Sequence, residues 1–170
     1  MRSETLLFAC FAFAAVPPPA LAHVTFETRQ AAANSNYKAV LQVPHGCKES
    51  PTVRIRVRMP DGVTNVKPQP KPGWKLEVTR VKSTKPIDAG HGQTVTETVS
   101  EVSWSGGELP NDHFEEFAIM MKLPERPGAT LYFPVVQDCK EGTHRWVGVP
   151  EKGKAAGDLN APALTLTPKR

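Results

Sequence analysis

Hydrophobic and polar residues alternate over several short stretches of this chain, with the two-residue period of β-strands that bury one face. In the clearest stretch, residues 52–59, arginines form the polar face and the apolar face consists of Val53, Ile55, Val57 and Met59. Residues 114–123 fit a strand or a short helix by periodicity, and the surrounding strands favour a strand. Further strands are predicted at 23–28, 37–43, 63–66, 74–81, 94–105, 129–137 and 144–149.

The segments between these predicted strands are rich in proline and glycine. The polar segment 82–93 carries a proline and two glycines and predicts an exposed loop. Residues 151–170 predict a loosely ordered C-terminal tail, with one edge strand expected at 164–167. About eight short strands with such connections predict an all-β fold, an antiparallel β-sandwich with Greek-key connections. We expect a single domain over residues 23–150.

The first 22 residues have the pattern of a secretory signal peptide. Arg2 supplies a positive charge, residues 6–16 are apolar or small, and Ala20-Leu21-Ala22 is a small-x-small triplet. The apolar run is shorter than the roughly 18 residues that a spanning helix needs, and no later segment is long and apolar enough either. We therefore expect cleavage after residue 22, no transmembrane segment in the mature chain, and a periplasmic or secreted protein that begins at His23.

The charge balance adds little to this picture. The chain has 21 Lys and Arg against 17 Asp and Glu, a formal net charge of +4. The basic residues are scattered between acidic ones, which is typical of a solvated surface. Together with the export signal, this argues against nucleic acid as a partner.

Cysteine usage agrees with export. Of the three cysteines, Cys10 leaves with the signal peptide, so Cys47 and Cys139 remain as one pair in an oxidising compartment. We expect a Cys47–Cys139 disulfide. A thiolate metal site is the alternative, but neither a CxxC motif nor Cys/His spacing supports it.

Cleavage after Ala22 would change the chemistry of His23. A histidine at a chain end offers a free α-amine and its own imidazole, which together can chelate one metal ion. Nitrogen ligands in a tetragonal arrangement favour Cu(II), which also stands highest in the Irving–Williams order. Both groups bind only when neutral, so affinity should fall in acid.

Several sequence blocks carry a resemblance to a known family. The blocks are His23-Val24-Thr25-Phe26-Glu27, Val43-Pro44-His45-Gly46-Cys47, Pro70-Lys71-Pro72-Gly73-Trp74, Trp104-Ser105-Gly106-Gly107-Glu108-Leu109-Pro110, Tyr132-Phe133-Pro134-Val135-Val136-Gln137 and His144-Arg145-Trp146. With these blocks in order over nearly all of the mature chain, the sequence resembles the YcnI-like domain family. Members are exported bacterial proteins with a cupredoxin-like or immunoglobulin-like β-sandwich, often encoded near copper genes. The resemblance implies a Cu(II)-binding protein with a single-histidine brace.

The resemblance also implies roles for particular residues. The amine and imidazole of His23 would hold the metal, and Trp146 would pack close by. The family's third ligand is a glutamate seven positions after the histidine, where this chain has Gln30. A neutral amide oxygen binds a cation less firmly than a carboxylate does, so we expect weaker Cu(II) binding than in glutamate-bearing relatives. Glu27 is the nearest substitute, but four residues of extended chain would place it about 13 Å from His23.

Two functional classes follow from these features. The first is a non-enzymatic copper-binding module for trafficking or homeostasis, with a copper-handling membrane or periplasmic protein as partner. The alternative is a mononuclear copper oxidase or monooxygenase on an extracellular substrate, which would need a second histidine, such as His113 or His144, beside His23. A non-metal envelope interaction domain is a third interpretation, favoured if the mature chain begins elsewhere.

Overall fold

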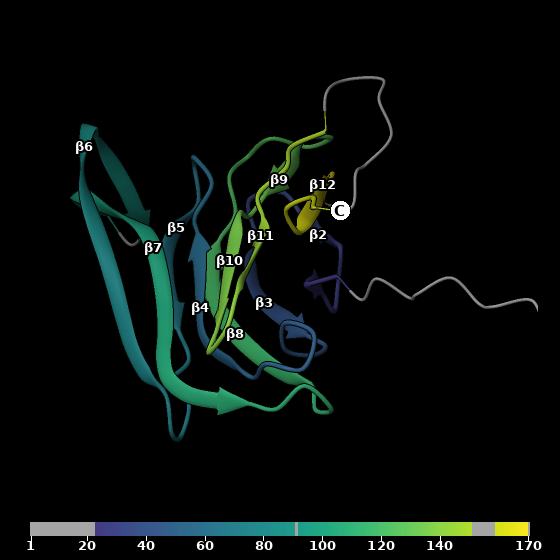
Figure 1. The fold of residues 1–170 in the computed structure, drawn as a ribbon. Coiled ribbons are helices and arrows are strands. Elements are labelled where there is room, and N and C mark those ends of the chain that lie inside the picture. The colour runs from purple at the N-terminus through teal and green to yellow at the C-terminus, as the bar shows by residue number, and fades with distance from the viewer. Residues whose placement is uncertain (1–22, 91, 151–158, 170) are drawn as a thin grey trace, which may run out of the picture.

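The computed structural model of the chain describes residues 23–90, 92–150 and 159–169, and every element within them is a β-strand (Figure 1). The expected signal peptide, residues 1–22, lies outside the described residues. No helix able to cross a membrane occurs in the described ranges. The strands are β1 (Thr25–Phe26), β2 (Gln30–Ala32), β3 (Asn36–Val43), β4 (Thr52–Arg58), β5 (Thr64–Pro68), β6 (Lys75–Gly90), β7 (Gln93–Leu109), β8 (Glu115–Lys122), β9 (Thr130–Tyr132), β10 (Val135–Cys139), β11 (Thr143–Trp146) and β12 (Ala163–Thr167).

Two antiparallel sheets form the layers of a β-sandwich. One has the strand order β1-β3-β8-β5 and the other the order β11-β10-β4-β7-β6. A smaller sheet, β2-β12-β9, lies at one end (Figure 1). The chain passes from β3 in one layer to β4 in the other and back to β5, so spatial neighbours are often distant in sequence. The all-β architecture expected from the alternating pattern is confirmed.

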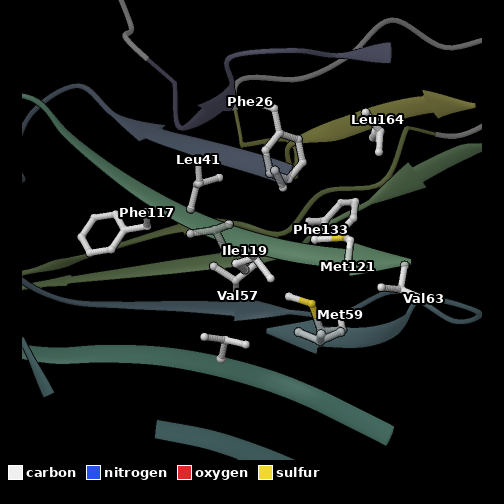
Figure 2. Packing of buried hydrophobic residues seen from close by; sticks show 14 of the residues in the cluster. Phe26, Leu41, Val57, Met59, Val63, Phe117, Ile119, Met121, Phe133 and Leu164 are labelled. Carbon is white, nitrogen blue, oxygen red and sulfur yellow. The ribbon is translucent and has the colours of Figure 1, made fainter. Parts of the chain in front are cut away.

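The hydrophobic core lies between the two larger sheets and extends to β12 of the smaller sheet, which contributes Leu164 (Figure 2). β8 turns Phe117 and Ile119 inward with a period of two, and β4 presents Ile55 and Val57 from the opposite layer. The rings of Trp104 in β7 and Phe117 are 5.2 Å apart, which joins the layers. Full burial of each large apolar side chain contributes about 1.5–3 kcal/mol. The apolar segment 114–123 is therefore a strand, as its surroundings predicted.

The hairpin of β6 and β7 is longer than the sequence predicted. Pairing between the two strands continues to Gly90 and Gln93, so the expectation of an exposed loop over 82–93 is wrong for residues 82–90. Pro86 is tolerated because β6 is the edge strand of its sheet and the pairing register shifts around this position. Two strands of 16 and 17 residues result.

The C-terminal strand β12 is a central strand and belongs to the domain. It pairs with β2 on one side and β9 on the other, and Leu164 and Leu166 are 0% and 1% exposed. The expectation of an edge strand in a loosely held tail is wrong for residues 159–169; residues 151–158 lie outside the described part. The alternate leucines Leu164 and Leu166 supply an apolar face that the fold buries. The partner strand β2 was not predicted, whereas β9 lies inside the predicted strand 129–137, which the structure divides into β9 and β10 of different sheets.

The predicted disulfide between Cys47 and Cys139 is present. Both half-cystines are buried, and the bridge joins the segment before β4 to the end of β10 across a sequence separation of 92. Closing a loop of this length stabilises the fold by about 4–5 kcal/mol in the chain-entropy model. The alternative of a thiolate metal site is thereby excluded for this pair.

Candidate functional site

His23 lies two residues before the first residue of β1, which is an edge strand of the four-stranded sheet. β1 pairs antiparallel with β3, which fixes the path of the chain that follows His23. Val24 and Phe26 are buried, whereas His23 and Thr25 are half-buried, so the side chains alternate as the sequence predicted. The His23 imidazole therefore leaves the backbone on the side away from Val24.

The imidazole of His23 packs against the indole of Trp146 in β11. The ring centroids are 5.3 Å apart and the ring planes meet at 80°, an edge-to-face arrangement. β1 and β11 are edge strands of different sheets, so this contact joins the two layers at their margin. The structure thus brings together the two residues that the family resemblance implied, His23 and Trp146.

Trp146 is held by a hydrogen bond from inside the fold. It is 3% exposed, and its indole Nε1 donates to Oε1 of Gln137 at 3.2 Å. The side-chain amide of Gln137 donates in turn to the carbonyl oxygen of His45 at 2.7 Å and to Oγ1 of Thr52 at 2.8 Å. Gln137 and Thr52 are 1% and 0% exposed, so the bonds of Gln137 to Thr52 and Trp146 are buried, and its bond to the His45 carbonyl is partly buried.

Sequence reasoning missed Gln137 and Thr52 as members of this site. Gln137 stands at an inward position of the alternating strand β10, between the buried residues Val135 and Cys139. A polar residue at a core position of an alternating strand is the signal that could have identified it. Thr52 takes the inward position predicted for Val53, because the register with β7 shifts between Thr52 and Arg54.

A second histidine, His144, contacts Trp146. His144 is the cross-strand partner of Gln137, and its ring centroid is 5.5 Å from that of Trp146. Burial lowers the pKa of His144, and the neighbouring charges of His45 and Lys48 lower it further. His144 is therefore biased toward the neutral form, beside Trp146.

The Nε2 atom of His23 is buried and has no hydrogen-bond partner among the described residues. A buried ring nitrogen without a polar partner is uncommon and calls for a physical explanation. Within residues 23–90, 92–150 and 159–169, no group of three or more His, Cys, Asp and Glu side chains is placed to hold a metal ion. Any metal at His23 would therefore rely on donors outside such a group, such as a chain-terminal amine or an amide oxygen.

Of the two other predicted ligands, Glu27 directly follows β1 and Gln30 is the first residue of β2. Glu27 is exposed, and its charge acts on Tyr37 in β3: burial raises the pKa of the Tyr37 hydroxyl to about 12, with Glu27 as the second cause. That hydroxyl donates to the carbonyl oxygen of Thr28 at 2.6 Å. Gln30 is exposed and pairs with Thr165 of β12, so it belongs to a different sheet from β1.

His113, the other histidine considered for a brace, stands in the turn before β8. Its side chain is 65% exposed, and its Nδ1 lies 2.8 Å from Oδ1 of Asp112. The contacts of His113 are thus local to this turn, whereas His144 shares the Trp146 contact with His23. Of the predicted residues, the structure groups His23, Trp146 and His144.

These features define an all-β sandwich with one buried disulfide and a histidine packed on a tryptophan where the two sheets meet. The family model described as "Domain of unknown function (DUF1775)" matches residues 23–166, and the chain belongs to this family. The match begins at His23 and extends into β12, which agrees with β12 being part of the domain.

Among solved structures, the chain is similar to an uncharacterized protein from Nocardia farcinica whose crystal structure reveals an immunoglobulin-like fold. The two chains are 25% identical with a TM-score of 0.64, and the alignment covers 87% of this chain and 99% of the other. The expected β-sandwich is therefore of the immunoglobulin-like kind. No curated protein matches the chain.

Proposed function

We propose that this protein is an exported, YcnI-like Cu(II)-binding protein that holds its ion with an N-terminal His23 and takes part in copper trafficking or homeostasis. The observation that carries the proposal is the environment of His23, whose imidazole is packed on Trp146 with its Nε2 buried and unpartnered among the described residues. Removal of the predicted signal peptide would add a free amine to this imidazole.

The chemistry of the chelate determines which ring nitrogen binds. The α-amine and Nδ1 of one histidine can close a six-membered ring around a metal, whereas Nε2 is too far from its own amine. A neutral imidazole that coordinates through Nδ1 carries its proton on Nε2. The buried Nε2 of His23 then becomes an N–H group, and the adjacent indole of Trp146 offers an aromatic surface to which such a group can donate.

The small number of protein ligands suits an ion that the protein transfers to a partner. An amine and one imidazole are neutral nitrogen ligands that favour Cu(II), and no group of three or more acidic, His and Cys side chains surrounds His23 in the described ranges. Few protein ligands leave coordination positions open to a partner, so we propose a copper-handling membrane or periplasmic protein as that partner. Gln30 remains the proposed third ligand, through its amide oxygen.

An enzymatic role is the alternative, as a mononuclear copper oxidase or monooxygenase. That chemistry would need a second histidine on the same ion, and of the two histidines considered for this role, His144 contacts Trp146. His144 contacts the same indole as His23. We propose a binding protein rather than an enzyme because the amine and imidazole of His23 are sufficient for binding, whereas the enzyme needs both histidines on one ion.

Copper titration of the exported protein tests the proposal. The chain is expressed with its own N-terminal segment, recovered from the exported fraction, and its intact mass is measured to identify the first residue. We expect a start at His23, one equivalent of Cu(II) bound, and loss of this site in His23→Ala. The matched control, His113→Ala, removes an exposed histidine elsewhere and should bind as the unmodified protein does. Equal Cu(II) binding by His23→Ala would contradict a site built on this histidine. A different first residue would also contradict the proposal and would favour an interaction domain without metal.

A second titration tests Gln30. A Gln30→Glu variant supplies the charged ligand found at this position in the family that the sequence resembles, so its Cu(II) affinity should rise. Equal affinities of the two proteins would show that position 30 does not coordinate the ion.

A further inference from the structure

Both N–H groups and the oxygen of the buried Gln137 amide have hydrogen-bond partners. Its two N–H bonds go to the carbonyl oxygen of His45 and to Oγ1 of Thr52, and its oxygen accepts from Nε1 of Trp146. The reverse orientation of the amide would place its NH₂ against the indole N–H and its oxygen against the His45 carbonyl. Three different partners therefore fix the orientation of this side chain.

The disulfide holds both ends of this set of hydrogen bonds in place. His45 precedes Cys47 by two residues, and Gln137 precedes Cys139 by two residues on the same face of β10. The bridge between these cysteines thus joins the two segments whose side chain and carbonyl meet at Gln137. Oγ1 of Thr52 also lies 3.7 Å from Sγ of Cys139, so the hydroxyl is enclosed between the bridge and the amide.

The hydrogen bond between Trp146 and Gln137 restrains the position of the indole ring. β11 is the last strand of its sheet, with a neighbour on one side only, so backbone pairing constrains it less than an interior strand. The bond to Gln137 ties the indole to the interior strand β10, while the indole ring meets the imidazole of His23. A polar network that is fully satisfied and buried makes its members rigid.

We propose that Gln137 is a positioning residue for the candidate copper site: through its bond to Nε1 it sets the angle and depth of Trp146, and so the surface on which His23 rests. This inference rests on the proposed function for its consequence in copper binding, but the positioning itself is a property of the metal-free protein.

The decisive experiment is proton–nitrogen NMR of the metal-free full chain. The indole N–H signal of Trp146 is assigned by its loss in Trp146→Leu, and the ring protons of His23 by their loss in His23→Ala. The indole shifts the His23 ring protons through its ring current, so the difference between the unmodified protein and Trp146→Leu measures the contact. In Gln137→Met, which keeps the length of the side chain but neither accepts nor donates as the amide does, we expect this difference to fall by about half or more.

Two further variants make the outcome specific. Thr52→Val removes one acceptor of the Gln137 amide while leaving its bond to Trp146, so it should change the same His23 signals in the same direction by less. Ile119→Val removes one methylene from the core on β8, and should leave the His23 and Trp146 signals unchanged. If Gln137→Met folds, unchanged His23 signals in that variant would overturn the proposal. If Gln137→Met does not fold, unchanged His23 signals in Thr52→Val would overturn it.

Copper binding is measured separately on the exported protein. We expect Gln137→Met to weaken Cu(II) affinity by roughly tenfold, the lower end of what loss of an outer-shell partner produces. If the unmodified protein binds no Cu(II), the proposed function fails while the metal-free NMR comparison still decides the role of Gln137. Altered NMR signals with unchanged Cu(II) affinity would contradict the part of the inference that concerns the metal.

Discussion

Replacement of Leu164 by alanine tests the finding that β12 is a central, buried strand. The side chain is 0% exposed and lies in the core cluster, and β12 has a partner strand on each side. Removing three carbon atoms from such a site loses about 2.4 kcal/mol of transfer free energy, at about 0.8 kcal/mol for each buried methylene. The cavity left behind adds to this, which gives a total of about 3–4 kcal/mol.

Urea unfolding of the two proteins measures this loss. With a slope of about 2 kcal/mol per molar urea, the midpoint should fall by roughly 1.5–2 M. The control is Thr165→Ala, because Thr165 is exposed on the same strand and its replacement should change the free energy of unfolding by less than about 0.5 kcal/mol. A loss below about 1 kcal/mol for Leu164→Ala would refute the reasoning, since that value suits a loosely held tail.

Three other predictions concern the stability of the fold. The double replacement of Cys47 and Cys139 by alanine should lower the free energy of unfolding in urea titrations by at most about 4–5 kcal/mol, because the unfolded chain is no longer cross-linked. Tyr37 should make the fold lose stability between pH 10 and 12: the unfolded chain releases this proton near 10, whereas burial raises the pKa in the folded protein to about 12. Two pKa units correspond to about 2.7 kcal/mol, which partial solvent exposure reduces to roughly 1 kcal/mol, measured as the difference in alkaline stability between the unmodified protein and Tyr37→Phe. Gly107→Ala should cost about 1–3 kcal/mol and change the near-ultraviolet circular dichroism, because a Cβ there would lie 2.2 Å from Cε2 of Trp74; an unchanged aromatic signal would show that the indole is not packed on this glycine.

The sequence predicted those strands whose one face is buried over several residues. β4 and β8 are examples, since Ile55 and Val57, or Phe117 and Ile119, repeat at every second position. It did not predict the outer half of the β6–β7 hairpin, where proline and glycine are tolerated at a sheet edge. Nor did it predict β2, a strand of three residues, or the division of segment 129–137 between β9 of the smaller sheet and β10 of a larger one, because such short strands are defined by their partners rather than by a pattern of their own.

The candidate site was predictable in part for a related reason. His23 was found from the cleavage pattern and Trp146 from the family resemblance, but the contact between them depends on two sheet edges that meet only in the folded chain. Gln137 was missed because a glutamine in an alternating strand is ordinarily placed on the solvent side. Its burial becomes intelligible only when Thr52 and the carbonyl of His45 are seen to satisfy it.

The most direct test of the proposed function is electron paramagnetic resonance of the exported protein loaded with one equivalent of Cu(II), together with its intact mass. We predict a first residue of His23 and a tetragonal Cu(II) spectrum with coupling to nitrogen, which His23→Ala abolishes and His113→Ala retains. A protein that begins at another residue, or a spectrum that His23→Ala leaves unchanged, would contradict a copper site built on this histidine.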